Sequence, residues 1–203
     1  VPFPSCIFKQ VSKLEPGHVI LIENGNLRKY PYWDITSFHF VEPKSERQIA
    51  EELREHLFRV TKSHMIADVP VCSFLSGGLD SSIITGLASK YNENINTYSV
   101  GFDVSSELRF ARIVSDYFNT NHHELIITND DFIKNIDKMV YHMDEPIGDA
   151  AFLPTLLLSE LISKHYKVVL AGEGADELFG GYDKYKMVLY GKKLSFFIPK
   201  LNY

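Results

Sequence analysis

The chain has 203 residues, a length typical of one domain with some additional chain. Apolar residues make up 45% and charged residues 23%, as in ordinary globular proteins. The formal net charge is -5 and no cluster of Lys and Arg is present, which argues against a general nucleic-acid binder, because phosphate contacts need clustered cations. No apolar stretch approaches the roughly 20 residues that a membrane span requires. We therefore expect neither a nucleic-acid partner nor a membrane.

Cysteine usage predicts a reducing compartment. The two cysteines, Cys6 and Cys72, lie far apart, and no Cys/His spacing fits a zinc site. Cys72 lies in an apolar run, which is typical of a buried small hydrophobic residue. We expect a cytoplasmic protein.

The first 43 residues are rich in proline and predict a β-hairpin. Residues 18–22 form an apolar run, and residues 27–32 can return as its partner strand. Between them lies Asn24-Gly25, a strong signal for a hairpin turn. Ser45 and Gln48 then form a capping box, and the apolar spacing after it predicts a helix over 46–66.

Strands and helices alternate through the rest of the chain. The pattern predicts strands at 69–75, 96–102, 123–127 and 168–171, and helices at 81–91, 106–119, 131–142, 152–165 and from about 176. Nearly all-apolar strands that alternate with helices indicate a parallel sheet covered on both faces. We therefore predict an α/β fold of the doubly wound type, preceded by the hairpin.

A turn rich in Gly and Ser follows the predicted strand at 69–75. It contains Ser76, Gly77, Gly78, Asp80, Ser81 and Ser82. Its backbone N–H groups and the start of the next helix can form an anion cradle, with hydroxyls as further donors. Asp80 would repel phosphate unless it holds Mg²⁺. The turn lacks the Gly-Lys-Ser/Thr of a Walker loop, and the alternative is a structural strand-to-helix turn capped by Asp80 or Ser81.

A second turn, at 171–177, follows the predicted strand at 168–171. It carries Gly172, Glu173, Gly174, Asp176 and Glu177. Since ligands of open α/β sheets bind beyond the carboxyl ends of the strands, both turns can serve one site. The carboxylates suggest Mg²⁺ binding or general-base chemistry, or else an acidic first helical turn favoured by the helix dipole. The acidic loop 144–149 is a weaker candidate, with a solvated loop as the alternative.

Taken in order, these motifs resemble those of the glutamine-dependent asparagine synthetase family over nearly the whole chain. Residues 76–82 match its pyrophosphate loop and 172–182 its second turn, and segments 98–102, 122–124 and 141–146 follow in the family's order. Residues 14–18 with Tyr32-Trp33 resemble the end of its glutaminase domain. The resemblance implies a PP-loop fold of the adenine nucleotide alpha hydrolase kind. Residues 1–43 would be a remnant of the glutaminase domain and a linker, and residues 44–203 the first part of the synthetase domain.

The resemblance also implies a mechanism. The carboxylate of aspartate would attack the α-phosphate of ATP to give an acyl-adenylate and pyrophosphate, and ammonia from glutamine would displace AMP. The residues that match the family's site are then assigned as follows: pyrophosphate binding to residues 76–82, Mg²⁺ binding to Asp80 and Asp176, the border of the adenosine to Leu75, Val100 and Gly172, and proton removal from the attacking amine to Glu173. A homodimer of the full-length protein is a further expectation.

Two departures from the family suggest an excised segment. The glutaminase nucleophile is an N-terminal Cys, whereas this chain begins at Val1 and Cys6 is internal. Family members also continue past residue 203 and carry a catalytic Lys there. We expect the segment alone neither to hydrolyse glutamine nor to make asparagine efficiently.

Three alternatives stay open at this point. The same chemistry on another acceptor would give a β-lactam synthetase, a lasso-peptide cyclase or a sugar-acid amidotransferase. Glu173 favours asparagine formation, since β-lactam-forming members carry Tyr there. A non-catalytic nucleotide-binding module is the second alternative. The third, a nucleic-acid-modifying PP-loop enzyme, predicts basic patches or a Cys pair, and the sequence has neither.

Overall fold

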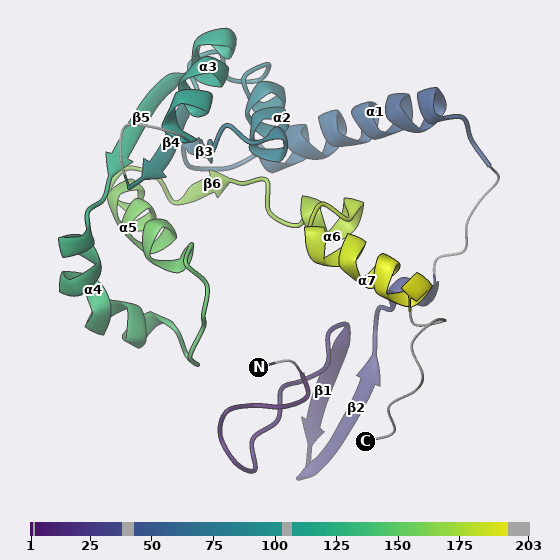
Figure 1. The fold of residues 1–203 in the computed structure, drawn as a ribbon. Helices are drawn as coiled ribbons and strands as arrows, with labels where there is room; N and C mark the ends of the chain where they lie inside the picture. Colours follow the sequence, from purple (N-terminus) through teal and green to yellow (C-terminus); the bar gives the residue numbers. More distant parts are fainter. Residues whose placement is uncertain (2, 38–42, 103–106, 195–203) are drawn as a thin grey trace. The chain divides into compact units, whose positions relative to one another are not determined.

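The computed structural model describes residues 1, 3–37, 43–102 and 107–194 (Figure 1). The chain divides into two compact units. One contains the residues up to Leu53 together with Ile136–Asp149, and the other contains Arg54–Asn135 and the chain from Ala150 onward. Linker residues 38–42 and the predicted helix start at 106 lie outside the described residues. Within the described ranges, no helix combines the length and the apolar character needed to cross a membrane.

The predicted hairpin is confirmed in the first unit. Strands β1 (His18–Glu23) and β2 (Asn26–Pro31) pair antiparallel, with Glu23 opposite Asn26. The connecting residues Asn24 and Gly25 have φ angles of 51° and 77°. Two successive positive φ angles define the tight turn that Asn-Gly favours. A short 3-10 helix, η1 (Ile35–Ser37), follows.

Helix α1 (Glu46–His64) begins with the predicted capping box. The Ser45 N–H donates to Gln48 Oε1 over 3.0 Å, and the Gln48 N–H donates to Ser45 Oγ over 3.4 Å. The two residues thus satisfy N–H groups that have no partner within the helix.

Four parallel strands form the sheet of the second unit. They are β3 (Val71–Phe74), β4 (Asn96–Gly101), β5 (Asn121–Ile126) and β6 (Val168–Leu170). Their order is β5-β4-β3-β6, with Ser73 opposite both Thr97 and Leu170. The carboxyl ends of β3 and β6 therefore lie side by side at one edge, as predicted for the two turns that follow them.

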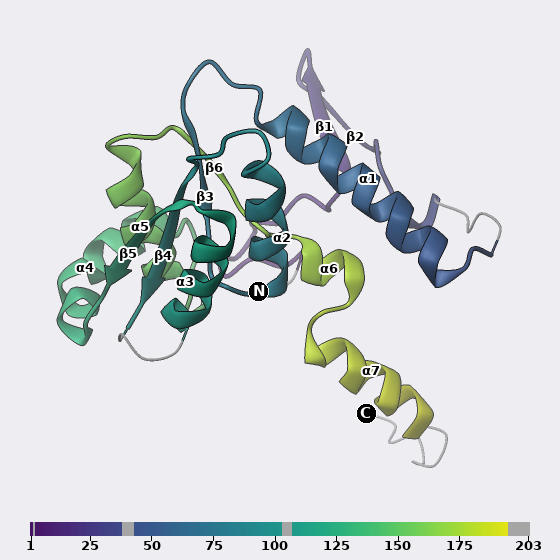
Figure 2. The ribbon, with the colours of Figure 1, turned by 90° about the horizontal axis from the view of Figure 1, so that it is seen from above.

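Helices cover both faces of this sheet, which confirms the predicted α/β fold. The helices that pack on it are α2 (Leu79–Ala88), α3 (Glu107–Phe118) and α5 (Phe152–Ser163). The other helices after β3 are α4 (Asn129–His142), α6 (Ala175–Phe179) and α7 (Asp183–Leu194). In Figure 2, α2 and α3 lie on one side of the strands and α5 on the other. Ala88 of α2 packs with Val71, whereas Leu158 of α5 packs with Cys72. Neighbouring residues of β3 thus face opposite helical layers.

Candidate functional site

The turn after β3 is braced by its own serines. The Ser76 N–H donates to Ser81 Oγ over 3.2 Å, and the two hydroxyls lie 2.9 Å apart. Ser82 donates its hydroxyl to the Gly78 carbonyl over 2.6 Å, and Gly78 caps the N-terminus of α2. The loop is therefore held in shape by the protein itself, with the positive end of a helix dipole behind it.

Gly77 brings this turn against α3. Its φ angle is +80°, and a Cβ there would lie 2.5 Å from the Ala111 backbone N. A side chain would therefore be strained and would also collide with backbone. Of the predicted loop residues, Gly77 and Ser82 do not line either pocket described below; the contacts of Gly77 with α3 and of Ser82 with Gly78 shape the loop.

The two predicted turns touch. A Cβ on Gly172, directly after β6, would lie 2.8 Å from the Ser81 backbone N and 3.0 Å from the Asp80 Cβ. Only glycine allows this approach without a shift of backbone. The turn then reverses at Gly174, whose φ angle is +90°, and enters α6. Residues almost a hundred positions apart in the sequence are thus neighbours in one site.

A cavity of about 210 Å³ lies between the two turns. We call it the acidic pocket, because four carboxylate residues line it: Asp80, Glu173, Asp176 and Glu177. Ser76, Gly78, Ser81 and Gly172 also line it. The pocket thus combines carboxylates, which favour a hard cation, with hydroxyls and a helix N-terminus, which favour an anion.

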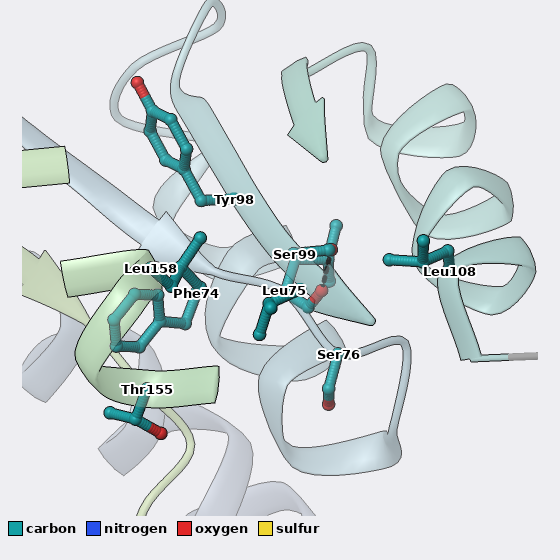
Figure 3. Close-up of a pocket in the computed structure, with 9 residues that line it drawn as sticks. Phe74, Leu75, Ser76, Tyr98, Ser99, Leu108, Thr155 and Leu158 are labelled. Atoms are coloured by element: carbon teal, nitrogen blue, oxygen red, sulfur yellow. Dashed lines mark hydrogen bonds between the residues drawn. The ribbon is translucent and has the colours of Figure 1, made fainter. Parts of the chain in front are cut away.

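A second, smaller cavity of about 140 Å³ lies beside β3 and β4 (Figure 3). We call it the apolar pocket, since most of its lining is hydrocarbon: Phe74, Leu75, Tyr98, Val100, Leu108 and Leu158, with Ser76, Ser99 and Thr155. Phe74 and Ser76 line both pockets, so the two adjoin. Together they can accept a ligand with a flat apolar end and a charged end.

Sequence reasoning missed several lining residues. The sequence places Glu177 in the second turn and Tyr182 at its end, without a role for either side chain. Tyr182 donates its hydroxyl to Glu177 Oε1 over 2.7 Å. This hydrogen bond lowers the pKa of Glu177 and raises the pKa of Tyr182 to about 12. Thr155 and Leu158 come from α5, where no motif marks them.

The acidic pocket fits Mg²⁺ only if the protein shares the ion with a bound phosphate. Within the described ranges, no group of three or more His, Cys, Asp or Glu side chains is placed to hold a metal. Mg²⁺ at nucleotide sites takes one or two carboxylates, with phosphate oxygens and waters as the other ligands. Asp80 and Asp176, which line the same pocket, match that donor set.

The third candidate, loop 144–149, contributes to neither pocket among the described residues. It belongs to the first unit, where Glu145 forms an ion pair with Lys13. That ion pair lowers the pKa of Glu145. Asp144 and Asp149 are exposed.

Comparisons with known proteins identify the family. The fold and the pockets define an α/β domain with two adjoining pockets at the carboxyl ends of its strands. A family model described as asparagine synthase matches residues 52–199. The chain belongs to this family.

Similar proteins include several named asparagine synthetases. A provisional glutamine-hydrolysing asparagine synthetase of Methanocaldococcus jannaschii is 38% identical, over 90% of this chain and 36% of that protein. Asparagine synthetase 1 of Bacillus subtilis is 35% identical, over 92% of this chain and 30% of that protein. The chain thus spans about a third of the length of these relatives. Among solved structures, the glutamine-dependent NAD+ synthetase of Acinetobacter baumannii in complex with ADP shares 18% identity and a TM-score of 0.48, over 77% of this chain and 32% of that one.

Proposed function

We propose that the full-length protein amidates a carboxylate at the expense of ATP, through an acyl-adenylate, with release of AMP and pyrophosphate. The close approach of Gly172 to Ser81 carries this proposal, because it joins the two turns into one acidic pocket beside an apolar one. Membership of the asparagine synthase family supports the same class of reaction.

Each pocket then receives one end of ATP. The adenosine lies in the apolar pocket, against the backbone of Leu75 and Val100. The pyrophosphate lies on the turn at 76–82, where N–H groups, hydroxyls and the α2 N-terminus stabilise the charge that develops on phosphate oxygens. Asp80 and Asp176 would hold Mg²⁺, which supplies further positive charge to those oxygens when it is bound.

Glu173 completes the reaction as general base. Its side chain is exposed and lines the acidic pocket, so it can reach a reacting group bound there. It would take a proton from the ammonia that attacks the acyl carbon. We propose aspartate as the acceptor and glutamine as the source of ammonia. The relatives in M. jannaschii and B. subtilis are named asparagine synthetases, which supports this choice over other acceptors.

ATP–pyrophosphate exchange by the full-length protein tests the proposal. We expect exchange with aspartate and none with sugar acids or β-amino acid precursors of β-lactams. Asp80→Ala should abolish exchange and weaken nucleotide–Mg²⁺ binding. Glu173→Gln should retain exchange and slow amide formation by about 10²–10⁴-fold, the usual contribution of a general base.

Asp183→Ala is the matched control, because Asp183 is an acidic residue of the next helix that lines neither pocket. Its activity should equal that of the wild type. Unchanged nucleotide–Mg²⁺ affinity in Asp80→Ala would refute the site assignment. Exchange with another acid in place of aspartate would mean that this acid is the acceptor, while the adenylation step stays as proposed.

Two further properties belong to the proposal. Cys6 and Cys72 are both free thiols, which suits the cytoplasm. A homodimer of the full-length protein is also proposed, and light scattering of the purified protein tests it.

A further inference from the structure

A partly buried histidine lies near the apolar pocket, on the face of the sheet that α3 covers. His122 of β5 leaves 10% of its side chain exposed. Its Nδ1 lies 2.9 Å from Thr97 Oγ1, and its Nε2 lies 3.4 Å from Ser99 Oγ and 3.6 Å from Glu124 Oε1. Ser99 in turn donates its hydroxyl to the Leu75 carbonyl (Figure 3). The chain of contacts therefore runs from His122 to a residue that lines the apolar pocket.

The hydrogen bonds around Ser99 indicate which atom is the donor in its contact with His122. A serine hydroxyl has one hydrogen, and Ser99 gives it to Leu75, so Ser99 can only accept from the imidazole. The Glu124 carboxylate also only accepts. Nε2 must therefore carry a hydrogen, whereas Nδ1 lies against the Thr97 hydroxyl, which also contacts Thr120. His122 is thus a donor aimed at Ser99.

The charges around His122 leave it neutral at moderately alkaline pH. Burial is the main cause that lowers the pKa of His122, and Glu124 opposes this. His123 and Arg112 lower the pKa further, and Asp116 raises it. At pH 8 the ring is therefore uncharged, and its contact with Ser99 is a hydrogen bond between neutral groups.

We propose that His122 is a positioning residue for the nucleotide: through Ser99 it fixes the Leu75 carbonyl at the rim of the apolar pocket. Leu75 is the last residue before the turn at 76–82, so its carbonyl sets the direction in which that turn leaves the strand. Ser99 is 4% exposed, so its hydroxyl relies mainly on partners within the protein. The proposal rests on ATP binding in these pockets, as proposed above.

The test compares ATP affinity of the full-length protein and its variants, by calorimetry with Mg²⁺ at pH 8. His122→Leu removes the donor and should weaken affinity about 3- to 10-fold, the value of one hydrogen bond. His122→Gln keeps an amide donor near the position of Nε2 and should stay within about twofold of the wild type.

Ser99→Ala closes a double-mutant cycle. If the effect runs through Ser99, the double variant His122→Leu with Ser99→Ala should lose no more affinity than Ser99→Ala alone. Thr120→Val is the matched control, because Thr120 contacts Thr97 on the side of the network away from Ser99. It should lower thermal stability and leave ATP affinity unchanged.

The proposal would be overturned if the losses of ATP affinity in the two single variants multiply in the double variant. Unchanged ATP affinity in His122→Leu would overturn it as well. Should His122→Leu not fold, His122→Asn takes its place in the cycle, since its shorter amide leaves Ser99 without a donor. Absence of ATP binding by the wild type would overturn the proposed function as well. That failure is distinct, because it is seen before any variant is made.

Discussion

The two faces of the parallel sheet are built from different side chains. The face toward α5 buries an apolar cluster of Cys72, Tyr98, Leu158 and Ile162. The face toward α2 and α3 also has an apolar cluster, which includes Ala88, and adds a group of buried hydroxyls: Ser73, Thr85, Thr97, Ser99 and Ser115. One face removes hydrocarbon from water, whereas the other must give each hydroxyl a partner.

The difference matters because hydrogen bonds have direction and apolar contacts do not. Burial of hydrocarbon stabilises the sheet in proportion to area. A hydroxyl that donates to one carbonyl, as Ser99 does to Leu75, fixes the position of that carbonyl. The apolar face thus carries stability, and the polar face carries the placement of the turn that lies at its edge.

The largest effect should come from the apolar face. Leu158 is 4% exposed, and Leu158→Ala leaves a cavity against Cys72 and Tyr98. We expect a loss of about 2–5 kcal/mol in the free energy of unfolding, measured by urea denaturation. Ser159→Ala, on the exposed side of the same helix, should stay within about 0.5 kcal/mol of the wild type. Equal losses at the two positions would contradict the assignment of this face as the core.

The fold was predictable because the spacing of apolar residues and the positions of turn-forming residues agree along most of the chain. Differences arise where a local residue overrides the pattern. Strand β3 begins at Val71 and not at 69, since Pro70 has no N–H to give to a neighbouring strand. Strand β5 begins at Asn121, two residues early, because its first residues are polar and gain strand structure only by pairing with β4.

The candidate site was predictable only where its residues are adjacent in the sequence. Asp80, Glu173 and Asp176 belong to Gly-rich turns, and parallel strands bring such turns to one edge. Thr155 and Leu158 carry no motif, whereas Ser99 belongs to the segment 98–102 that resembles the family. All three reach the apolar pocket by the packing of α5 and β4. Polar residues such as His122 give no apolar signal, so their burial follows from tertiary contacts alone.

A smaller effect should come from the polar face. Ser73 and Thr85 place their hydroxyls 3.0 Å apart, and both side chains are fully buried. Thr85→Val removes one partner and should cost about 1–3 kcal/mol, because a buried polar group is left with fewer hydrogen bonds. Adding Ser73→Ala should recover part of that loss, since neither hydroxyl then remains. A double variant with the full sum of both losses would show that the pair is not coupled.

The smallest effect should be a pH-dependent contribution to stability from an ion pair at the edge of the polar face. Arg112 donates to both carboxylate oxygens of Glu124, over 2.6 and 2.5 Å, and this hydrogen bonding is the main cause that lowers the pKa of Glu124 below 4.5. The Arg112 side chain is 44% exposed, so solvent screens the pair, and its contribution to stability should be smaller than that of the Ser73–Thr85 pair.

Because the pKa of Glu124 is lower in the folded protein than in the unfolded chain, the contribution is present above pH 4.5 and is lost as the pH falls through the folded value. We expect Glu124→Gln to be less stable than the wild type at pH 7, with a difference in the free energy of unfolding that shrinks below pH 4.5. High salt should reduce the difference at pH 7. If the difference in the free energy of unfolding stays constant down to pH 3, Glu124 acts through packing and not through its charge. The edge of the polar face would then stabilise the fold in the same way as the apolar face.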